Sequence, residues 1–167
     1  MEVLRHVRDR SDRLTSGHSG RVALCVAVTC WAPAACETPD PELIPDERLR
    51  TELGLTETDR VHTIGLFTGV GERADPDSVL VAPGEFVQFV SGDWLVHELA
   101  FDLDSLSADR RDFLVRTRQA ESPPLLERDS RFVLSFVEAP PGRYPYSLAG
   151  NREPGRGLIV VVAPEPR

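Results

Sequence analysis

The chain has 167 residues, of which 41% are hydrophobic, and this length suits one domain of ordinary size with additional segments. Its formal net charge is −8, and its 19 basic residues are all arginines that are scattered along the sequence. Nucleic-acid binding usually rests on clustered basic residues, so this composition argues against a nucleic-acid partner.

The first 35 residues have the layout of a signal peptide. An arginine-rich segment precedes an apolar run over residues 22–32, which is too short to span a bilayer, since that takes roughly 20 residues. Small residues follow, and Cys36 then begins an acidic, proline-rich stretch. This order resembles a bacterial lipoprotein signal, which implies that Cys36 becomes the lipidated first residue of the mature chain. Ordinary cleavage after Ala34, or a buried helix or strand over residues 22–32, are the alternatives.

The cysteines support this interpretation. Cys25, Cys30 and Cys36 all lie in or at the end of the leader, so the remaining chain has no disulfide and no thiolate ligand. Cleavage before Cys36 removes five arginines and three acidic residues, which leaves 14 arginines, 24 acidic residues and a net charge of −10. We expect an exported protein, periplasmic or at the cell surface, whose only membrane attachment is lipid.

The region between the leader and the main domain is predicted to be a tether. It covers residues 36–59, and its proline-rich beginning is unsuited to packing a core. A short helix over residues 46–53 is expected to end at Gly54. The domain itself is assigned to residues 60–163, followed by a tail over residues 164–167.

The domain consists of short apolar runs separated by turn residues. Because β-branched and aromatic residues favour strands, these runs predict strands over residues 60–68, 78–81, 85–90, 95–101, 131–137, 143–148 and 157–162. One helix interrupts them, with Ser107 as its N-cap and Leu106, Phe113 and Leu114 facing the core. The predicted fold class is therefore an all-β, antiparallel Greek-key sandwich with one inserted short helix.

Two groups of residues carry a resemblance to a known family. In the first, a Pro-Gly turn starts the run 81–90, and His97 follows it. The second comprises the runs 132–136, 141–146 and 155–160. Together they resemble the cupredoxins, the blue-copper proteins, in which His97 would stand at the first copper ligand and the second group would form the closing strands. The resemblance covers about residues 60–163 and implies a cupredoxin-like domain.

The same resemblance identifies the positions of the other copper ligands. The cysteine position is occupied by Leu148, the second histidine by Asn151 and the axial methionine by Arg156; a shift by one residue puts Ser147 at the cysteine position. A blue-copper centre needs a thiolate, and the sequence after residue 36 has neither cysteine nor methionine. We therefore expect no intact type 1 copper site and no cofactor. Copper held at a non-blue site that includes His97 is the alternative.

Other metal sites have less support. His97 and His62 together with carboxylates have the donors for copper or zinc, but nothing in the sequence brings the two imidazoles together. The simpler interpretation makes His97 a half-buried residue that is hydrogen-bonded to a loop. Asp102 and Asp104 are better explained by helix capping than by calcium, because the other residues of a calcium loop are missing.

The expected function is binding or structural. There is no hydrolase elbow, metalloprotease motif or phosphate-binding glycine loop, and Ser147 has no recognisable base, so we expect no enzyme. The partner is expected to be an extracytoplasmic protein or a small ligand, bound by loops that carry His97, Asn151 and Arg156. Arg152 and Arg156 either bind an anion there, or pair with Glu153, or are solvated.

Overall fold

The computed structural model describes residues 40–163. The predicted signal segment, Cys36 and the predicted tail lie outside these residues. No helix within the described range is long and apolar enough to cross a membrane.

The helical elements are η1 (Pro41–Leu43), α1 (Glu47–Leu53), η2 (Leu103–Ser105) and α2 (Ala108–Arg116). The strands are β1 (Val61–Thr68), β2 (Glu72–Asp75), β3 (Ser78–Val81), β4 (Phe86–Ser91), β5 (His97–Phe101), β6 (Arg131–Ser135), β7 (Gly142–Gly150) and β8 (Gly155–Val161).

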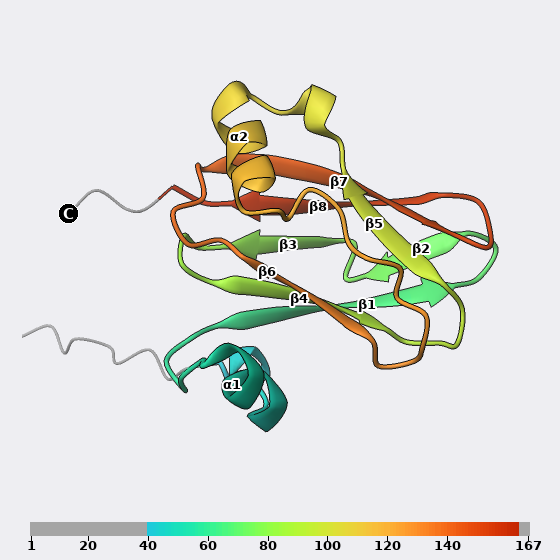
Figure 1. Ribbon diagram of the computed structural model, residues 1–167, viewed down its shortest axis with the longest axis horizontal. Helices are drawn as coiled ribbons and strands as arrows, with labels where there is room; N and C mark the ends of the chain where they lie inside the picture. The colour runs from blue at the N-terminus through green and yellow to red at the C-terminus, as the bar shows by residue number, and fades with distance from the viewer. Residues whose placement is uncertain (1–39, 164–167) are drawn as a thin grey trace, which may run out of the picture. The chain divides into compact units, whose positions relative to one another are not determined.

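The described strands form two four-stranded sheets, with the orders β2-β1-β4-β6 and β3-β8-β7-β5 (Figure 1). This arrangement confirms the predicted all-β sandwich with one inserted short helix. The sheets are mixed rather than purely antiparallel, since β1 pairs with β4 and β3 pairs with β8 in parallel. The physical reason is that the chain changes sheet between most consecutive strands, so that neighbours within a sheet are seldom hairpin partners.

The core lies between the sheets and follows the alternation of each strand. On β7, Tyr144, Tyr146 and Leu148 are buried, while the residues between them are half-buried or exposed. The ring of Tyr146 meets Phe89 of β4 edge to face, with 5.1 Å between the centroids. The ring of Tyr144 packs in the same way on Phe136, with 5.6 Å between the centroids. Aromatic contacts of this kind therefore join the two sheets.

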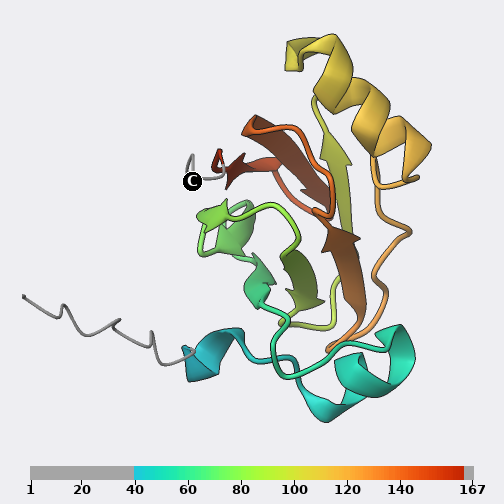
Figure 2. The ribbon, with the colours of Figure 1, turned by 90° about the vertical axis from the view of Figure 1, so that its left-hand side faces the viewer.

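Two helices flank the sandwich on opposite sides, as both ribbon views show (Figure 2). Helix α1 was predicted; Asp46 accepts a hydrogen bond from the N–H of Leu49, and Gly54 ends the helix in the left-handed region with φ of 68°. Helix α2 buries Phe113 and Leu114 as expected. Ser107 stands at its N-cap position, but its hydroxyl accepts from the Nε of Arg110 instead of capping the helix.

Strand β2 was not predicted. Its sequence, Glu72-Arg73-Ala74-Asp75, contains no apolar run, and it forms because it pairs with β1 in antiparallel register. Only the side chains of Glu72 and Ala74 are buried along it. A polar strand at a sheet edge carries too little local signal to be found from composition.

Three loops meet at one end of the sandwich, which we call the loop end. They are the β1–β2 turn (residues 69–71), the β4–β5 loop (residues 92–96) and the β7–β8 turn (residues 151–154). The β1–β2 and β7–β8 turns touch through a bridge between Gly71 and Glu153. The segment η1 packs against β1, which starts at Val61 and ends at Thr68 next to the loop end. An eight-residue strand is about 25 Å long, so the β1–β2 turn lies about that far from the start of β1.

The outer edge of β5 is covered by the segment that follows α2. The N–H and carbonyl groups of His97 both pair with Leu125, and the N–H of Phe101 donates to the carbonyl of Ala120. Between them, the carbonyl of Leu99 accepts from the N–H of Ser122, whose hydroxyl accepts from the N–H of Leu99. The segment therefore supplies partners to alternate residues of this strand.

Candidate functional site

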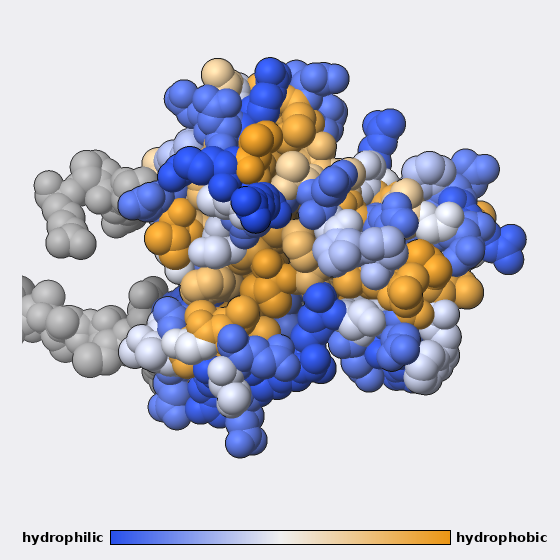
Figure 3. Space-filling model, viewed as in Figure 1, coloured by the Kyte–Doolittle hydropathy of each residue, from blue (hydrophilic) through white to orange (hydrophobic). Residues whose placement is uncertain are grey.

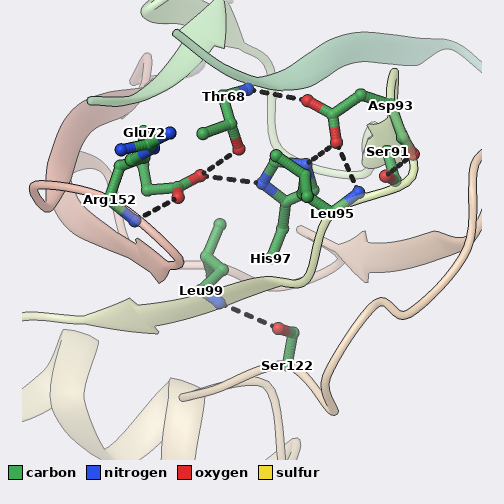
Figure 4. A network of polar contacts seen from close by, with 9 residues as sticks. All are labelled: Thr68, Glu72, Ser91, Asp93, Leu95, His97, Leu99, Ser122 and Arg152. Carbon is green, nitrogen blue, oxygen red and sulfur yellow. Dashed lines mark hydrogen bonds and ion pairs between the residues drawn. The ribbon is translucent and has the colours of Figure 1, made fainter. Parts of the chain in front are cut away.

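His97, the first residue of β5, lies at the centre of a buried polar network near the loop end (Figure 4). Its side chain is 0% exposed. Nδ1 lies 3.0 Å from Oε2 of Glu72, and Nε2 lies 3.0 Å from Oδ1 of Asp93. The two carboxylates thus bond to different nitrogens of one imidazole ring, which has no further polar atom to offer.

Glu72 reaches the ring because β2 turns it inward. Its carboxylate also accepts from the hydroxyl of Thr68 at 3.1 Å and from the backbone N–H of Arg152 at 3.2 Å. Gly150 makes this approach possible, since a Cβ there would lie 2.5 Å from Oε1 of Glu72. A buried carboxylate requires such partners, because removing its hydration without replacing the hydrogen bonds costs several kcal/mol.

Asp93 holds the β4–β5 loop in place. Its carboxylate accepts from the N–H groups of Thr68 and Leu95, each at 2.8 Å, and its carbonyl accepts from the hydroxyl of Ser91 at 3.0 Å. Burial raises the pKa of Asp93, but the hydrogen bonds from Leu95, Thr68 and His97 lower it by more, so the net pKa lies below the ordinary value. Asp93 is therefore ionised at neutral pH.

The residues at the copper positions do not fit a type 1 copper centre. Leu148 is fully buried opposite Leu99 and offers no donor atom, while Asn151 and Arg156 are exposed. Both ring nitrogens of His97 are already hydrogen-bonded to carboxylates. Glu72 and Asp93 lie on different sides of the ring, so their oxygens do not converge on one metal position. Among the described residues, no group of three or more His, Cys, Asp or Glu side chains is arranged to hold a metal ion.

The structure does not bring His62 and His97 together, so they do not share a metal site. His62 lies near the start of β1, where its Nε2 is 2.8 Å from Oε2 of Glu85, whereas His97 lies beside the residues at the end of β1. Oε2 of Glu85 also accepts from the N–H of Ala82 at 2.8 Å. His62 therefore has a separate carboxylate partner at the start of its strand.

Several predicted residues have different surroundings from those expected. His97 is fully buried rather than half-buried, because β2 covers it as well as the β4–β5 loop. Asp102 stands at the N-cap position of η2, but its side chain makes no capping hydrogen bond. Within the described part of the chain, neither Arg152 nor Arg156 forms an ion pair with Glu153.

Sequence reasoning missed the carboxylates that hold His97. Glu72 lies 25 residues before it, on a strand that was not predicted, so no local pattern indicates the contact. Asp93 lies four residues before His97 and directly after Gly92. The Gly92-Asp93 pair is typical of a turn, and it was the one sequence signal that could have placed Asp93 in a loop near His97.

The loop end also exposes apolar side chains that were not singled out in the sequence. Val70 is 98% exposed, Trp94 73% and Leu95 41%. Apolar atoms are visible at the right-hand end of the surface in Figure 3, among polar ones. Trp94 lies between Asp93 and Leu95, whose mutual hydrogen bond fixes the backbone on both sides of it. The polar network therefore presents this tryptophan on a fixed loop.

Comparisons with known proteins give only structural similarities. No family model matches the sequence, and no curated protein matches it either. Amicyanin from Paracoccus versutus is 17% identical with a TM-score of 0.43, and the match covers 65% of this chain and 86% of amicyanin. Plastocyanin from Dryopteris crassirhizoma is 24% identical with a TM-score of 0.42, over 59% of this chain and 98% of plastocyanin. The Cu-containing nitrite reductase from Thermus scotoductus is 20% identical with a TM-score of 0.48, over 67% of this chain and 25% of the reductase.

Proposed function

We propose that this chain is an exported, lipid-anchored, cupredoxin-like binding module that works without type 1 copper and docks a partner protein at its loop end. The observation that carries the proposal is the state of His97, whose two ring nitrogens each bond to a carboxylate at 3.0 Å. Because both ring nitrogens are bonded to carboxylates of the protein, His97 has a structural role: it stabilises the loop end. The loops of this end can then bind a partner through their exposed side chains.

The exposed apolar residues support a protein partner. Val70 and Trp94 belong to different loops, and these loops are joined because Asp93 accepts from the N–H of Thr68. Tryptophan is enriched at the energetically important positions of protein interfaces, and a rigid loop reduces the entropy lost on binding.

Copper titration tests the metal-free part of this proposal. Residues 37–167, which form a compact unit of their own, are titrated with Cu(II) and followed by calorimetry, optical spectra and EPR. We expect no tight one-to-one binding that depends on His97, because copper would have to displace the carboxylate that is bonded to whichever ring nitrogen it binds.

Two variants separate the possible results. His62→Ala is the matched control for His97→Ala, since each removes one imidazole that is paired with a carboxylate. One-to-one copper binding that is lost in His97→Ala and kept in His62→Ala, with both variants folded, contradicts the proposal. That result favours the alternative function, a copper-handling protein with a non-blue site.

Lipid attachment is tested separately from copper. In a bacterial host that processes lipoproteins, the full chain is expected to incorporate labelled fatty acid and to sediment with membranes. Cys36→Ala is expected to abolish both properties, whereas Cys30→Ala, within the leader, is expected to preserve them. Labelling that persists in Cys36→Ala contradicts the proposed anchor.

A further inference from the structure

An open groove of about 770 Å³ lies on the outer face of the second sheet, between β7–β8 and the segment with η2 and α2. We call it the arginine groove, because Arg110, Arg143 and Arg156 line it. Asp102, Pro145 and Leu158 also contribute to its lining. The groove lies on a sheet face and not at the loop end, so it is independent of the function proposed above.

The guanidinium groups of this groove lack acidic partners. Among the described residues, none of the three arginines forms an ion pair, although acidic residues outnumber basic ones by 27 to 19 in the sequence. Arg110 is held by two neutral acceptors, the hydroxyl of Ser107 and the carbonyl of Arg143, each at 2.9 Å. Other described arginines also lack an ion pair, so what distinguishes these three is that they line one groove together, where they can face a single external anion.

The strand register fixes the spacing of the cations. Arg156 on β8 pairs with Ser147 on β7, and Arg143 stands four residues before Ser147 on the same face of β7. Four residues of an antiparallel strand span about 13–14 Å, so the two arginines lie about that far apart along the groove. The paired residues Pro145 and Leu158 lie between them and form an uncharged floor.

Asp102 adds a negative charge near the middle of the groove. Its N–H donates to the carbonyl of Pro145 at 3.1 Å, which places Asp102 beside the floor and between the two cationic ends. A ligand anion at the middle would be repelled there. The groove is therefore suited to negative charges at its two ends and a neutral or basic group at its centre.

We propose that the arginine groove binds an extended acidic segment of a partner protein, with carboxylates at positions i and i+4 and an uncharged or basic side chain at i+2. One carboxylate lies at Arg110 and Arg143, and the other at Arg156. An extended peptide matches this groove because its side chains at i, i+2 and i+4 point to one side and repeat every 6.8 Å or so. The shallow, open form of the groove also suits a peptide that lies across a sheet face.

The test uses three labelled peptides and the purified full chain, at low ionic strength, with binding followed by fluorescence anisotropy. The first peptide is Ser-Glu-Ser-Gln-Ser-Glu-Ser, which has the proposed spacing. The second has the same composition with adjacent acids, Ser-Ser-Glu-Glu-Gln-Ser-Ser. The third, Ser-Glu-Ser-Glu-Ser-Glu-Ser, carries an additional acid at the centre.

We expect the first peptide to bind at least threefold more tightly than the second. Arg143→Gln and Arg156→Gln are each expected to weaken its binding about three- to tenfold, the range for an exposed, charge-assisted contact. Arg116 is also exposed and lies in the last turn of α2, so Arg116→Gln removes the same charge elsewhere and should change nothing. Asp102→Asn should raise the affinity for the third peptide several-fold and that for the first peptide less.

Three results would overturn the proposal. Equal binding of the first two peptides indicates attraction without a defined spacing. Equal losses in Arg116→Gln and in the groove variants indicate an effect of net charge alone. Binding of a sulfated polysaccharide that depends on Arg143 and Arg156, without binding of the first peptide, assigns the groove to a different class of ligand.

Discussion

Glu72 and His97 are 25 residues apart in the sequence, and their side chains meet at 3.0 Å inside the sandwich with neither exposed to solvent. Glu72 belongs to an edge strand of the first sheet, and His97 to an edge strand of the second. Nδ1 of His97 has Glu72 as its partner, and Oε2 of Glu72 is shared between His97 and the hydroxyl of Thr68. The contact therefore joins the two sheets and makes each residue dependent on the other.

Removing one member of this pair is expected to destabilise the fold strongly. His97→Leu removes the imidazole from Oε2 of Glu72, which stays fully buried, and a buried polar group that loses a hydrogen-bond partner typically costs about 1–3 kcal/mol. Urea unfolding measures the change. The double variant with Glu72→Leu should lose less than the sum of the two single losses, because neither member of the pair is then left without the other. Strictly additive losses would show that the two side chains do not interact.

Asp93 is expected to give the fold part of its acid sensitivity. Its folded pKa is lowered from the ordinary value of 3.8, so its contribution is complete well above that value and is lost as the pH falls through the lower folded pKa. The difference in unfolding free energy between the natural chain and Asp93→Asn should therefore be constant above about pH 5 and shrink below about pH 4. Urea unfolding at a series of pH values checks this. A difference that is the same at every pH would contradict the lowered pKa.

The two tyrosines of β7 should respond differently to loss of their hydroxyl groups. The hydroxyl of Tyr144 donates to the carbonyl of Pro140 at 2.6 Å, and burial raises the pKa of this tyrosine to about 12. The buried hydroxyl of Tyr146 has no hydrogen-bond partner among the described residues. We expect Tyr144→Phe to lower the unfolding free energy by about 0.5–1.5 kcal/mol, and Tyr146→Phe to leave it unchanged or raise it. Thermal unfolding of both variants gives the comparison, and equal losses would refute it.

Asp46 is expected to stabilise α1 and to attach it to the sandwich. One carboxylate oxygen accepts from the N–H of Leu49 at 2.9 Å, and the other lies 2.6 Å from Nη1 of Arg131 on β6. Loss of an N-cap costs about 0.5–2 kcal/mol, so Asp46→Ala should lower the unfolding free energy by about that amount. Glu47→Ala, at the adjacent exposed position, is the control and should change it little. The same loss in both variants would exclude a specific capping role.

The sequence was sufficient to predict the parts of the fold whose signal is local. The strand β4 could be predicted because four of its six residues are phenylalanine or valine, and α1 because Asp46 and Gly54 mark its ends. Strand β2 could not be predicted in this way, because Glu72 and Arg73 have no strand preference of their own. Its conformation depends on pairing with β1, which is a property of the folded chain.

In the candidate site, too, some residues could be predicted from local sequence and others depend on strand pairing. His97 was identified by its position after the Pro-Gly turn and the strand that follows it. Its partner Glu72 depends on the register of β1 with β2, and the arginine groove depends on the register of β7 with β8. Both pairs are joined by short turns, but their registers depend on the turn geometry and on which side chains the sandwich buries, and the residue types alone do not give them.

The covered edge of β5 restricts how another protein can bind there. His97, Leu99 and Phe101 already use their outward N–H groups for Leu125, Ser122 and Ala120. A peptide that extended the second sheet by adding a strand at this edge would first have to strip away the segment that carries these three partners. Recognition on this side of the molecule therefore has to proceed through side chains, and the same coverage protects the edge from pairing with another copy of the chain.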